Sequence, residues 1–393
     1  MSFHKKALYT DMTQNYLTPV EPMSHTRVKV RFRTGRGNVD RVTICYNGQK
    51  AIMRKDSFDD MFDYYAYHIR LTDEPLYYHF EVEAEDESCY YNRLGISKSE
   101  EARYDFILVP GFATPDWAKG AVVYQIYVDR FYNGDSSNDV VNDEYFYQGR
   151  PVKHAGHWND PVSRTDEGTF YGGDLQGIID KMDYLEGLGV EVLYLNPIFV
   201  SPSSHKYDIQ DYSHIDPHFG KIVNREECGL KDGYEQYRGI TTDRENLEAS
   251  DRLFARLVEE AHKRGMKVIL DGVFYCCGSW HRFMDKEGIY ANGDTCSIKG
   301  AYQDSNSPYR EYFQYKNPQD ANSYENWWGY EAYAKFNYEN SRKLYEYILS
   351  VAVKWVSKPF CADGWRVDVA ASVGNNREWN HYFWQDFRKA VKA

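Results

Sequence analysis

The chain has 393 residues, of which 42% are hydrophobic and 27% are charged, so it can fold into two or three domains and is not intrinsically disordered. A formal net charge of −12 argues against nucleic acid as a partner. The sequence contains no run of about 18 apolar residues, so we expect no membrane-spanning helix and no membrane partner.

The N-terminal sequence and the cysteines predict a cytoplasmic protein. Residues 1–17 include two lysines but no apolar segment of the kind that a secretory signal needs. The seven cysteines are scattered along the chain, and none of them forms a Cys-x-x-Cys pair. We therefore expect free thiols in a reducing compartment.

Apolar and polar residues alternate through the first part of the chain. The apolar positions form three rows, Val28, Val30 and Phe32; Tyr65, Tyr67, Ile69 and Leu71; and Tyr78, Phe80, Val82 and Ala84. Asn47-Gly48 is a hairpin turn signal. Residues 1–112 are therefore predicted to form an antiparallel β-sandwich. Pro110-Gly111 and Pro115 read as a linker, and all nine tryptophans lie at or after residue 117.

Beyond the linker, strand and helix signals alternate. Short apolar runs at 121–127, 190–195, 268–273 and 364–369 predict four strands. Helical spacing of apolar residues begins at Leu175, Leu253 and Leu344, and a fourth helix is expected over 378–393. Four strand–helix units predict a parallel sheet with helices outside it over residues 113–393. A long aromatic and polar stretch follows the third predicted strand, at about 274–340; the family resemblance described below implies that it is an inserted loop domain.

Charged residues occur at the ends of two of these predicted strands. Residues two apart in a strand share a face, so Arg366 and Asp368 project together, while the apolar residues between and beside them face the other way. A buried ion pair that stabilises the sheet would give the same pattern. Asp271, however, also ends a predicted strand, and parallel α/β barrels gather their catalytic groups at that edge. We therefore interpret these three residues as a candidate catalytic site.

Five stretches of the second region carry a family resemblance. They are GAVVYQIYVDRFYNGD (120–135), YGGDLQGIIDKMDYLEGLGVEVLYLNPIF (171–199), HKYDIQDYSHIDPHFG (205–220), VILDGVFYCCG (268–278) and DGWRVDVA (363–370). Together they resemble the α-amylase family of glycoside hydrolases, and within it the neopullulanase and cyclomaltodextrinase branch. The first region is similar to the accessory, starch-binding-type domain of that branch. The resemblance implies that the parallel sheet belongs to a TIM (β/α)8 barrel.

The resemblance also implies a retaining mechanism with a covalent glycosyl-enzyme. Asp368 would be the nucleophile, Arg366 would hold it ionised, and Asp271 would orient the loop that follows its strand. Tyr207 would stack on the sugar at the cleavage point, although it could equally be a packing tyrosine. Asp208 would support the loop that carries Tyr207.

An Asn- and Asp-rich loop follows the first predicted strand of the second region. Such a loop has the composition of a calcium site, because hard cations take oxygen ligands, although it is not an EF-hand. By resemblance, a structural calcium would bind between this loop and the Gly-Gly-Asp motif, with ligands Asn133, Asp135, Asn138, Asp139, Gly172 through its carbonyl, and Asp174. A solvated polar loop is the alternative, and Asp174 could simply begin its helix.

The sequence departs from the family pattern at the substrate-binding positions. The third-strand motif normally continues Phe-Asn-His, whereas here Tyr275 and Cys276 follow Phe274. A thiol is a weak hydrogen-bond donor, so sugar positioning by Cys276 should suffer. The segment ending in Asn337 only loosely matches the Pro-Lys-Leu-Asn motif, and Ala371-Ser372 replaces the usual Asn-Glu. Linkage specificity, cyclic or linear substrate preference, and hydrolysis or transglycosylation stay open.

The number of strand–helix units is a larger departure. The family places its acid–base glutamate on the fifth barrel strand and a His-Asp pair after the seventh, whereas four units of an expected eight are found here. We therefore expect the first half of a barrel, in a truncated chain that lacks the acid–base glutamate. We predict that this chain alone is not an active glycosidase.

Two functions remain in competition at this point. The first is an enzyme, an α-glucan hydrolase or transglycosylase acting on maltodextrin, cyclodextrin or pullulan. The second is a non-catalytic glucan-binding homologue, which Tyr275 and Cys276 favour. The partner expected in both cases is an α-glucan oligosaccharide or polysaccharide. Resemblance also implies a possible homodimer formed through the N-terminal domain.

Overall fold

The computed structural model describes residues 3–85, 87–162, 167–225, 233–291 and 298–393. Its contacts divide the chain into two compact units, Met1–Lys119 and Gly120–Ala393. Each unit has its own hydrophobic core. They are therefore described separately.

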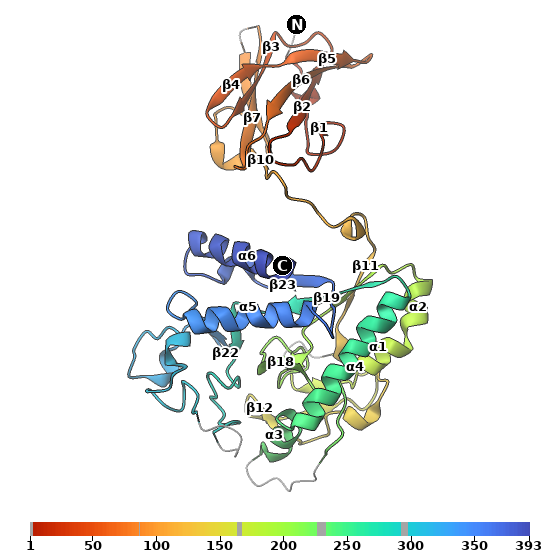
Figure 1. Cartoon of the computed structure of the whole chain (residues 1–393), viewed down its shortest axis with the longest axis vertical. Helices are drawn as coiled ribbons and strands as arrows, with labels where there is room; N and C mark the ends of the chain where they lie inside the picture. Colours follow the sequence, from red (N-terminus) through yellow and green to blue (C-terminus); the bar gives the residue numbers. More distant parts are fainter. Residues whose placement is uncertain (1–2, 86, 163–166, 226–232, 292–297) are drawn as a thin grey trace. The chain divides into compact units, whose positions relative to one another are not determined.

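Two antiparallel sheets form the N-terminal unit (Figure 1). The first sheet has the order β1 (Leu17–Thr18), β2 (Arg27–Gly35), β6 (Phe62–Arg70) and β5 (Arg54–Phe58). The second has the order β4 (Gln49–Ile52), β3 (Arg41–Tyr46), β7 (Leu76–Ala84), β8 (Glu87–Asn92) and β9 (Gly95–Ser97), with β10 (Phe106–Leu108) also paired to β7.

Alternating burial along these strands builds the core of the N-terminal unit. Val28, Val30 and Phe32 of β2 are fully buried, and the residues between them are not. Asn47 and Gly48 have φ values of 42° and 76° and join β3 to β4. A two-residue turn with both φ values positive matches the right-handed twist of a hairpin. The predicted strands and turn of this region are confirmed.

A four-stranded parallel sheet lies at the centre of the C-terminal unit (Figure 1). Its order is β11 (Val123–Ile126), β16 (Val192–Leu195), β19 (Lys267–Gly272) and β23 (Gly364–Val367), and every neighbouring pair is parallel. The helices are α1 (Leu175–Asp180), α2 (Met182–Gly187), α3 (Glu235–Thr241), α4 (Arg244–Lys263), α5 (Arg342–Val356) and α6 (Arg377–Lys392). The single helix expected from Leu175 onward is two short helices, because Lys181 leaves helical geometry with φ −100° and ψ 7°.

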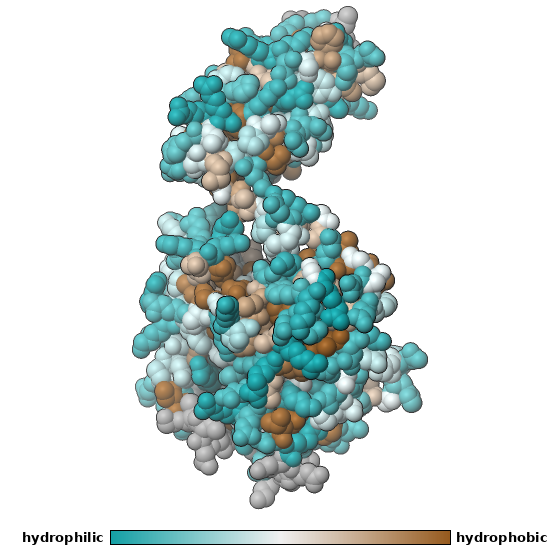
Figure 2. Space-filling view, turned by 45° about the vertical axis from the view of Figure 1, so that its right-hand side comes forward, coloured by the Kyte–Doolittle hydropathy of each residue, from teal (hydrophilic) through white to brown (hydrophobic). Residues whose placement is uncertain are grey.

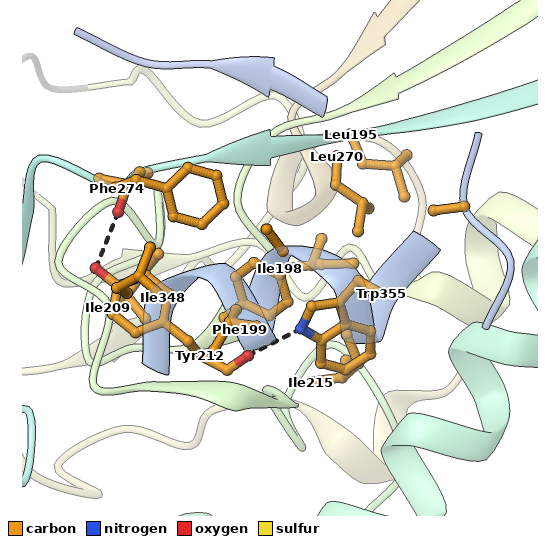
Figure 3. Packing of buried hydrophobic residues seen from close by; sticks show 14 of the residues in the cluster. Leu195, Ile198, Phe199, Ile209, Tyr212, Ile215, Leu270, Phe274, Ile348 and Trp355 are labelled. Atoms are coloured by element: carbon orange, nitrogen blue, oxygen red, sulfur yellow. Dashed lines mark hydrogen bonds between the residues drawn. The ribbon is translucent and has the colours of Figure 1, made fainter. Parts of the chain in front are cut away.

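Side chains from the sheet, from α5 and from the segment 198–215 make one core (Figure 3). Trp355 of α5 is fully buried, packs against Phe199 with ring centroids 5.2 Å apart, and donates from Nε1 to the carbonyl oxygen of Tyr212 at 2.9 Å. Burial of a large aromatic side chain stabilises a fold by roughly 1.5–3 kcal/mol. This core fixes the chain segment that follows β16 against the sheet.

Smaller strands occur in the long connections. β20 (Cys276–Gly278), β22 (Tyr330–Lys335) and β21 (Asn326–Trp327) form a three-stranded antiparallel sheet in that order. The remaining pairs join β12 (Phe146–Tyr147) to β13 (Arg150–Pro151), β14 (Lys153–His154) to β15 (Thr169–Phe170), and β17 (Phe199–Val200) to β18 (Asp211–Ile215). In the described part of the chain, no helix is both long enough and apolar enough to cross a membrane.

Candidate active site

Three charged side chains meet where β19 and β23 end. Asp271 of β19 is the register partner of Arg366 of β23, so parallel pairing sets the two side by side. Arg366 Nη1 donates to Asp271 Oδ1 at 2.9 Å and to Asp368 Oδ1 at 2.8 Å. The side chain of Asp271 is fully buried, whereas that of Asp368 is 18% exposed. One carboxylate therefore anchors the arginine and the other reaches the surface.

Two tyrosine hydroxyls complete the surroundings of Asp271. Tyr194 and Tyr207 donate to its Oδ2 at 2.5 Å and 2.9 Å. Burial raises the pKa of Asp271, against the lowering effect of the Tyr194 hydroxyl and the Arg366 guanidinium. Burial lowers the pKa of Arg366, but the hydrogen bond and charge of Asp271 outweigh it and the net pKa is raised. The arginine is therefore always charged beside Asp368.

The strand geometry separates this polar face from an apolar one. Trp365 points away from Arg366, donating from Nε1 to the carbonyl oxygen of Ala352 in α5 at 3.1 Å. Directly after Asp368, Val369 has a φ of 45°. A β-branched residue at positive φ is strained, and such strain is found where the surrounding structure holds a backbone for function. The chain therefore turns sharply at Asp368.

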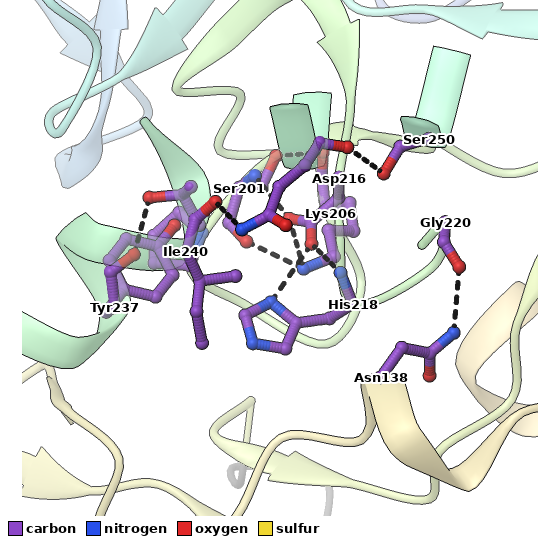
Figure 4. A network of polar contacts seen from close by, with 12 residues as sticks. Asn138, Ser201, Lys206, Asp216, His218, Gly220, Tyr237, Ile240 and Ser250 are labelled. Atoms are coloured by element: carbon purple, nitrogen blue, oxygen red, sulfur yellow. Dashed lines mark hydrogen bonds and ion pairs between the residues drawn. The ribbon is translucent and has the colours of Figure 1, made fainter. Parts of the chain in front are cut away.

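A buried polar network includes Lys206, the residue that precedes Tyr207 (Figure 4). Lys206 Nζ lies 2.7 Å from Asp216 Oδ2, which also accepts from the backbone N–H of Ser201 at 2.9 Å. His218 lies between Asp216, at 3.2 Å, and Glu144, at 2.9 Å. All four charged or titratable side chains are at most 2% exposed.

The charges of this network compensate one another. Burial alone would raise the pKa of Asp216, but Lys206 and His218 bring it well below its usual range. Burial alone would lower the pKa of His218, but Glu144 and Asp216 raise it. The network therefore holds Lys206, and with it the adjacent Tyr207, in one position. Sequence reasoning missed it, because its members come together only in the folded chain.

The other predicted substrate-binding residues are buried. Asp208 is 2% exposed, accepts a hydrogen bond from Ser203, and has its pKa raised by burial. Cys276 is fully buried, and burial raises the pKa of its thiol, with a smaller contribution from the charge of Asp368. Asn337 is 4% exposed, and its Oδ1 has no hydrogen-bond partner in the part of the chain that the structure describes. None of the three contacts Asp368 through a hydrogen bond, so their contact with a sugar stays a prediction.

The Asn- and Asp-rich loop packs against the Gly-Gly-Asp motif. Asn133 Nδ2 donates to Asp139 Oδ1 at 2.8 Å. Gly172 has a φ of 78°, and a Cβ there would meet both of these atoms at 2.5 Å. Asp174 caps α1 by accepting from Gly177 N–H at 2.6 Å. Asn133, Asp139 and Gly172 thus lie together, and Asp174 begins its helix.

Two further members of the predicted calcium set differ in their surroundings. Asp135 forms an ion pair with Lys221. Burial alone would raise the pKa of Asp135, but Lys221 and Ser137 lower it below its usual value. Asn138 is fully buried and donates from Nδ2 to Asp174 Oδ2 and to the carbonyl oxygen of Gly220. Within the described residues, its Oδ1 has no hydrogen-bond partner. A buried acceptor without a donor suits a cation, which makes this site fit calcium.

No group of three or more His, Cys, Asp or Glu side chains in the described residue ranges is arranged to hold a metal ion. The loop instead offers amide and backbone carbonyl oxygens beside single carboxylates. Such oxygens are ligands that calcium accepts and that zinc and other softer metals do not favour.

Comparison with known proteins identifies the family of the chain. The family model for the α-amylase catalytic domain matches residues 125–228 and 245–392, and the model for the N-terminal Ig-like domain of α-amylases matches residues 1–109. The chain belongs to the α-amylase family.

Two relatives and one solved structure define the branch. The chain is 32% identical to Neopullulanase 2 of Thermoactinomyces vulgaris, over 95% of this chain and 56% of the relative. It is also 32% identical to a cyclomaltodextrinase of Thermoanaerobacter pseudethanolicus (strain ATCC 33223 / 39E), over 95% of this chain and 57% of the relative. The type III pullulan hydrolase from Thermococcus kodakarensis superposes with a TM-score of 0.60 at 27% identity, over 98% of this chain and 59% of that structure. The chain thus spans between half and two thirds of each of these proteins.

Proposed function

We propose that this chain carries the nucleophile of an α-glucan hydrolase or transglycosylase, with maltodextrin, cyclodextrin or pullulan as the substrate class. The observation that carries the proposal is the cluster of Arg366, Asp271 and Asp368 at the ends of two adjacent parallel strands. Membership of the α-amylase family and the names of the relatives give the substrate class.

Each residue has one role in the proposed reaction. An Asp368 oxygen attacks the anomeric carbon, the bond to the leaving oxygen breaks, and an acid supplies the proton that this oxygen takes. The resulting glycosyl ester is then transferred to water or to a sugar hydroxyl. Arg366 orients the Asp368 carboxylate through a hydrogen bond, and Asp271 holds Arg366. Tyr207 offers its ring to the sugar while its hydroxyl is bound to Asp271.

The proton for the leaving oxygen cannot come from Asp271. Its Oδ2 accepts from two tyrosines, both of its oxygens accept from Arg366, and its side chain is fully buried, so it serves as a hydrogen-bond acceptor that does not reach the surface. We propose that β11, β16, β19 and β23 correspond to the first half of the family's barrel and that residues 1–393 alone do not turn over. This chain covers only 56% to 59% of the lengths of the two relatives and of the solved structure, which supports this proposal.

A substrate that needs no acid tests the nucleophile directly. In α-maltosyl fluoride the leaving group departs as fluoride, so the Asp368 carboxylate can form the ester bond as the C–F bond breaks, without a proton donor. We expect intact-mass and peptide spectra to show one added maltosyl group on Asp368, and none on the Asp368→Asn variant. Binding of maltoheptaose without any adduct on wild type would contradict the enzymatic proposal.

A non-catalytic glucan-binding protein is the second candidate. The observation in its favour is that Cys276 is fully buried where the family pattern places a sugar-binding histidine. A site without that hydrogen bond can hold a glucan and still fail to align it for attack. The fluoride experiment separates the two candidates, because only the enzyme forms the adduct.

We also propose a structural calcium ion at the loop between β11 and α1. Its ligands would be Asn138 Oδ1, the amide or carboxylate oxygens of Asn133 and Asp139, and the Gly172 carbonyl oxygen, with Asp135 and Asp174 shaping the loop around them. The ion would supply positive charge to a buried oxygen cluster and so stabilise the loop.

Two further parts of the proposal concern location and assembly. We propose a cytoplasmic protein, in accord with the free thiols of Cys45, Cys89, Cys276, Cys277 and Cys361 in the described residues. We also propose a homodimer through the N-terminal unit, in which Phe58 and Met61 are 64% and 67% exposed. Light scattering would test this proposal. We expect a dimer for the wild type and a monomer for the double variant Phe58→Ser, Met61→Ser.

A further inference from the structure

The hairpin that joins β21 to β22 ends in an exposed tryptophan. Trp328 and Gly329 form its two-residue turn, with φ values of 51° and 88°, between the paired residues Trp327 and Tyr330. Trp328 is 85% exposed, a larger fraction than any other large apolar side chain in the described parts of the chain. The face of the C-terminal unit seen in Figure 2 is mainly hydrophilic, with apolar patches between polar side chains. A ring exposed to this degree contributes little to the core.

The backbone makes this residue choice costly. A turn with positive φ at both central positions prefers Asn-Gly, because asparagine tolerates the left-handed region and a bulky aromatic side chain does not. Tryptophan therefore strains the turn and also exposes apolar area to water. Neither effect stabilises the fold, and strain of this kind is found at binding sites.

The tryptophan ends a row of aromatic rings that begins beside the nucleophile. The backbone N–H of Asp368 donates to the carbonyl oxygen of Gly272 at 3.0 Å, so the nucleophile lies beside the segment that leads, three residues later, to Tyr275. The Tyr275 and Trp327 ring centroids are 6.2 Å apart, and the Trp327 and Trp328 centroids are 5.8 Å apart with ring planes at 28°. The row therefore runs from the proposed cleavage site out to the tip of the hairpin.

A hollow of about 390 Å³ lies along this row. Tyr275, Trp327 and Trp328 line it together with Asn326, Glu325 and Lys335, which supply hydrogen-bonding groups. Aromatic faces with a few polar side chains suit a ligand that has both flat apolar faces and hydroxyl groups. A pyranose ring has C–H groups on its faces and hydroxyls at its edge.

We propose that the Trp328 hairpin is a platform for a glucosyl unit remote from the bond that is cleaved, so that it selects long α-glucan chains over short ones. This inference rests on the proposed function, because a glucan can extend along the row of rings to Trp328 only if it is bound at Asp368. The hairpin supports the polymer chain and does not take part in the chemistry. A short oligosaccharide fills the cleavage site without touching Trp328.

Calorimetric titration of the full chain with maltotriose and with maltoheptaose tests the platform. The Trp328→Asn variant removes the ring and introduces the preferred Asn-Gly turn. We expect its Tm to rise by roughly 2 °C or more, because the substitution relieves the backbone strain of the turn. We expect its Kd for maltoheptaose to rise about tenfold, because one contact between a ring and a sugar is lost. Its Kd for maltotriose should stay within about twofold of the wild-type value.

Two matched variants complete the experiment. Trp328→Phe keeps an aromatic face on the same strained turn and should retain most of the preference for maltoheptaose. Tyr184→Ala removes a 55% exposed ring from α2 and should change neither affinity.

An unchanged maltoheptaose affinity in Trp328→Asn, or a lower Tm, would overturn the platform while leaving the proposed function intact. A wild-type chain that binds neither sugar would overturn the proposed function, and the platform with it.

Discussion

The C-terminal unit contains two clusters of buried charge that differ in how they are closed. In the first, Lys206, Asp216, His218 and Glu144 satisfy one another and are buried and sealed from solvent; Figure 4 shows the contacts among Lys206, Asp216 and His218. In the second, Arg366 joins a buried Asp271 to a partly exposed Asp368. A buried charge is tolerated when it is fully paired, and it is available for chemistry when one group keeps a route to solvent. Both clusters contain ion pairs, so an ion pair alone does not identify a reactive site. The partial exposure of Asp368 is what distinguishes the second cluster.

The largest effect is expected from removing the exposed carboxylate. Asp368→Asn should lower the rate of labelling by α-maltosyl fluoride by about a thousandfold or more, because an amide is a poor nucleophile. Its Tm should change little, since Arg366 stays paired with Asp271. The labelling assay measures the change in rate, and thermal unfolding of the same variant measures the change in Tm. A collapse of the fold in this variant would place Asp368 with the structural ion pairs instead.

The sealed cluster should show the opposite behaviour. Asp216→Asn leaves Lys206 and His218 without their shared carboxylate, so unfolding free energy should fall by about 3–5 kcal/mol. Urea denaturation measures this loss. As a matched surface control, Asp183→Asn removes an exposed carboxylate that pairs with Arg264 and should cost less than about 1 kcal/mol. Equal losses in the two variants would remove the distinction drawn between sealed and exposed pairs.

Calcium should stabilise the loop between β11 and α1 by an intermediate amount. An ion held at a hundred times its Kd contributes about 2.7 kcal/mol, so excess calcium should raise the Tm of the C-terminal unit by several degrees over the chelated protein. Asp139→Ala should abolish this shift, because it removes a carboxylate beside Asn133 and Gly172. A calcium-induced shift of equal size in Asp139→Ala would contradict the proposed ligand set.

The smallest effect is a pH dependence from the sealed cluster. The pKa of His218 is raised in the folded chain, so its protonation contributes stability that is complete below its unfolded pKa of about 6.5 and is lost as the pH rises through the folded value. Unfolding free energy in the wild type should therefore fall as the pH rises above about 6.5. Subtracting the profile of His218→Gln isolates this contribution, and a difference profile that is flat or rises with pH would show that the histidine is neutral when folded.

Part of this picture follows from the sequence. Period-two spacing placed Arg366 and Asp368 on one face with Trp365 on the other, and the position of Asp271 at a strand end put it beside them, as the structure shows. These are local rules of strand geometry. The family relationship inferred from the five motifs is confirmed.

Other features depend on contacts between distant segments. Tyr194 was missed, although a hydroxyl within an otherwise apolar strand was a usable signal for a polar partner at that edge. The Lys206 network could not be foreseen, because residues from 144 to 218 meet only after folding. The burial of Cys276 likewise depends on the pairing of β20 with β22, which its neighbours in sequence do not specify.

A crystal structure of the Asp368→Asn variant with maltotetraose would test the central claim most directly. The account predicts a glucosyl ring against Tyr207 with its anomeric carbon within about 3.5 Å of the residue 368 side chain, which is the distance needed for attack. It also predicts that Arg366 still bridges residues 271 and 368. A sugar bound elsewhere on the unit, with the residue 368 side chain turned away from it, would contradict the account.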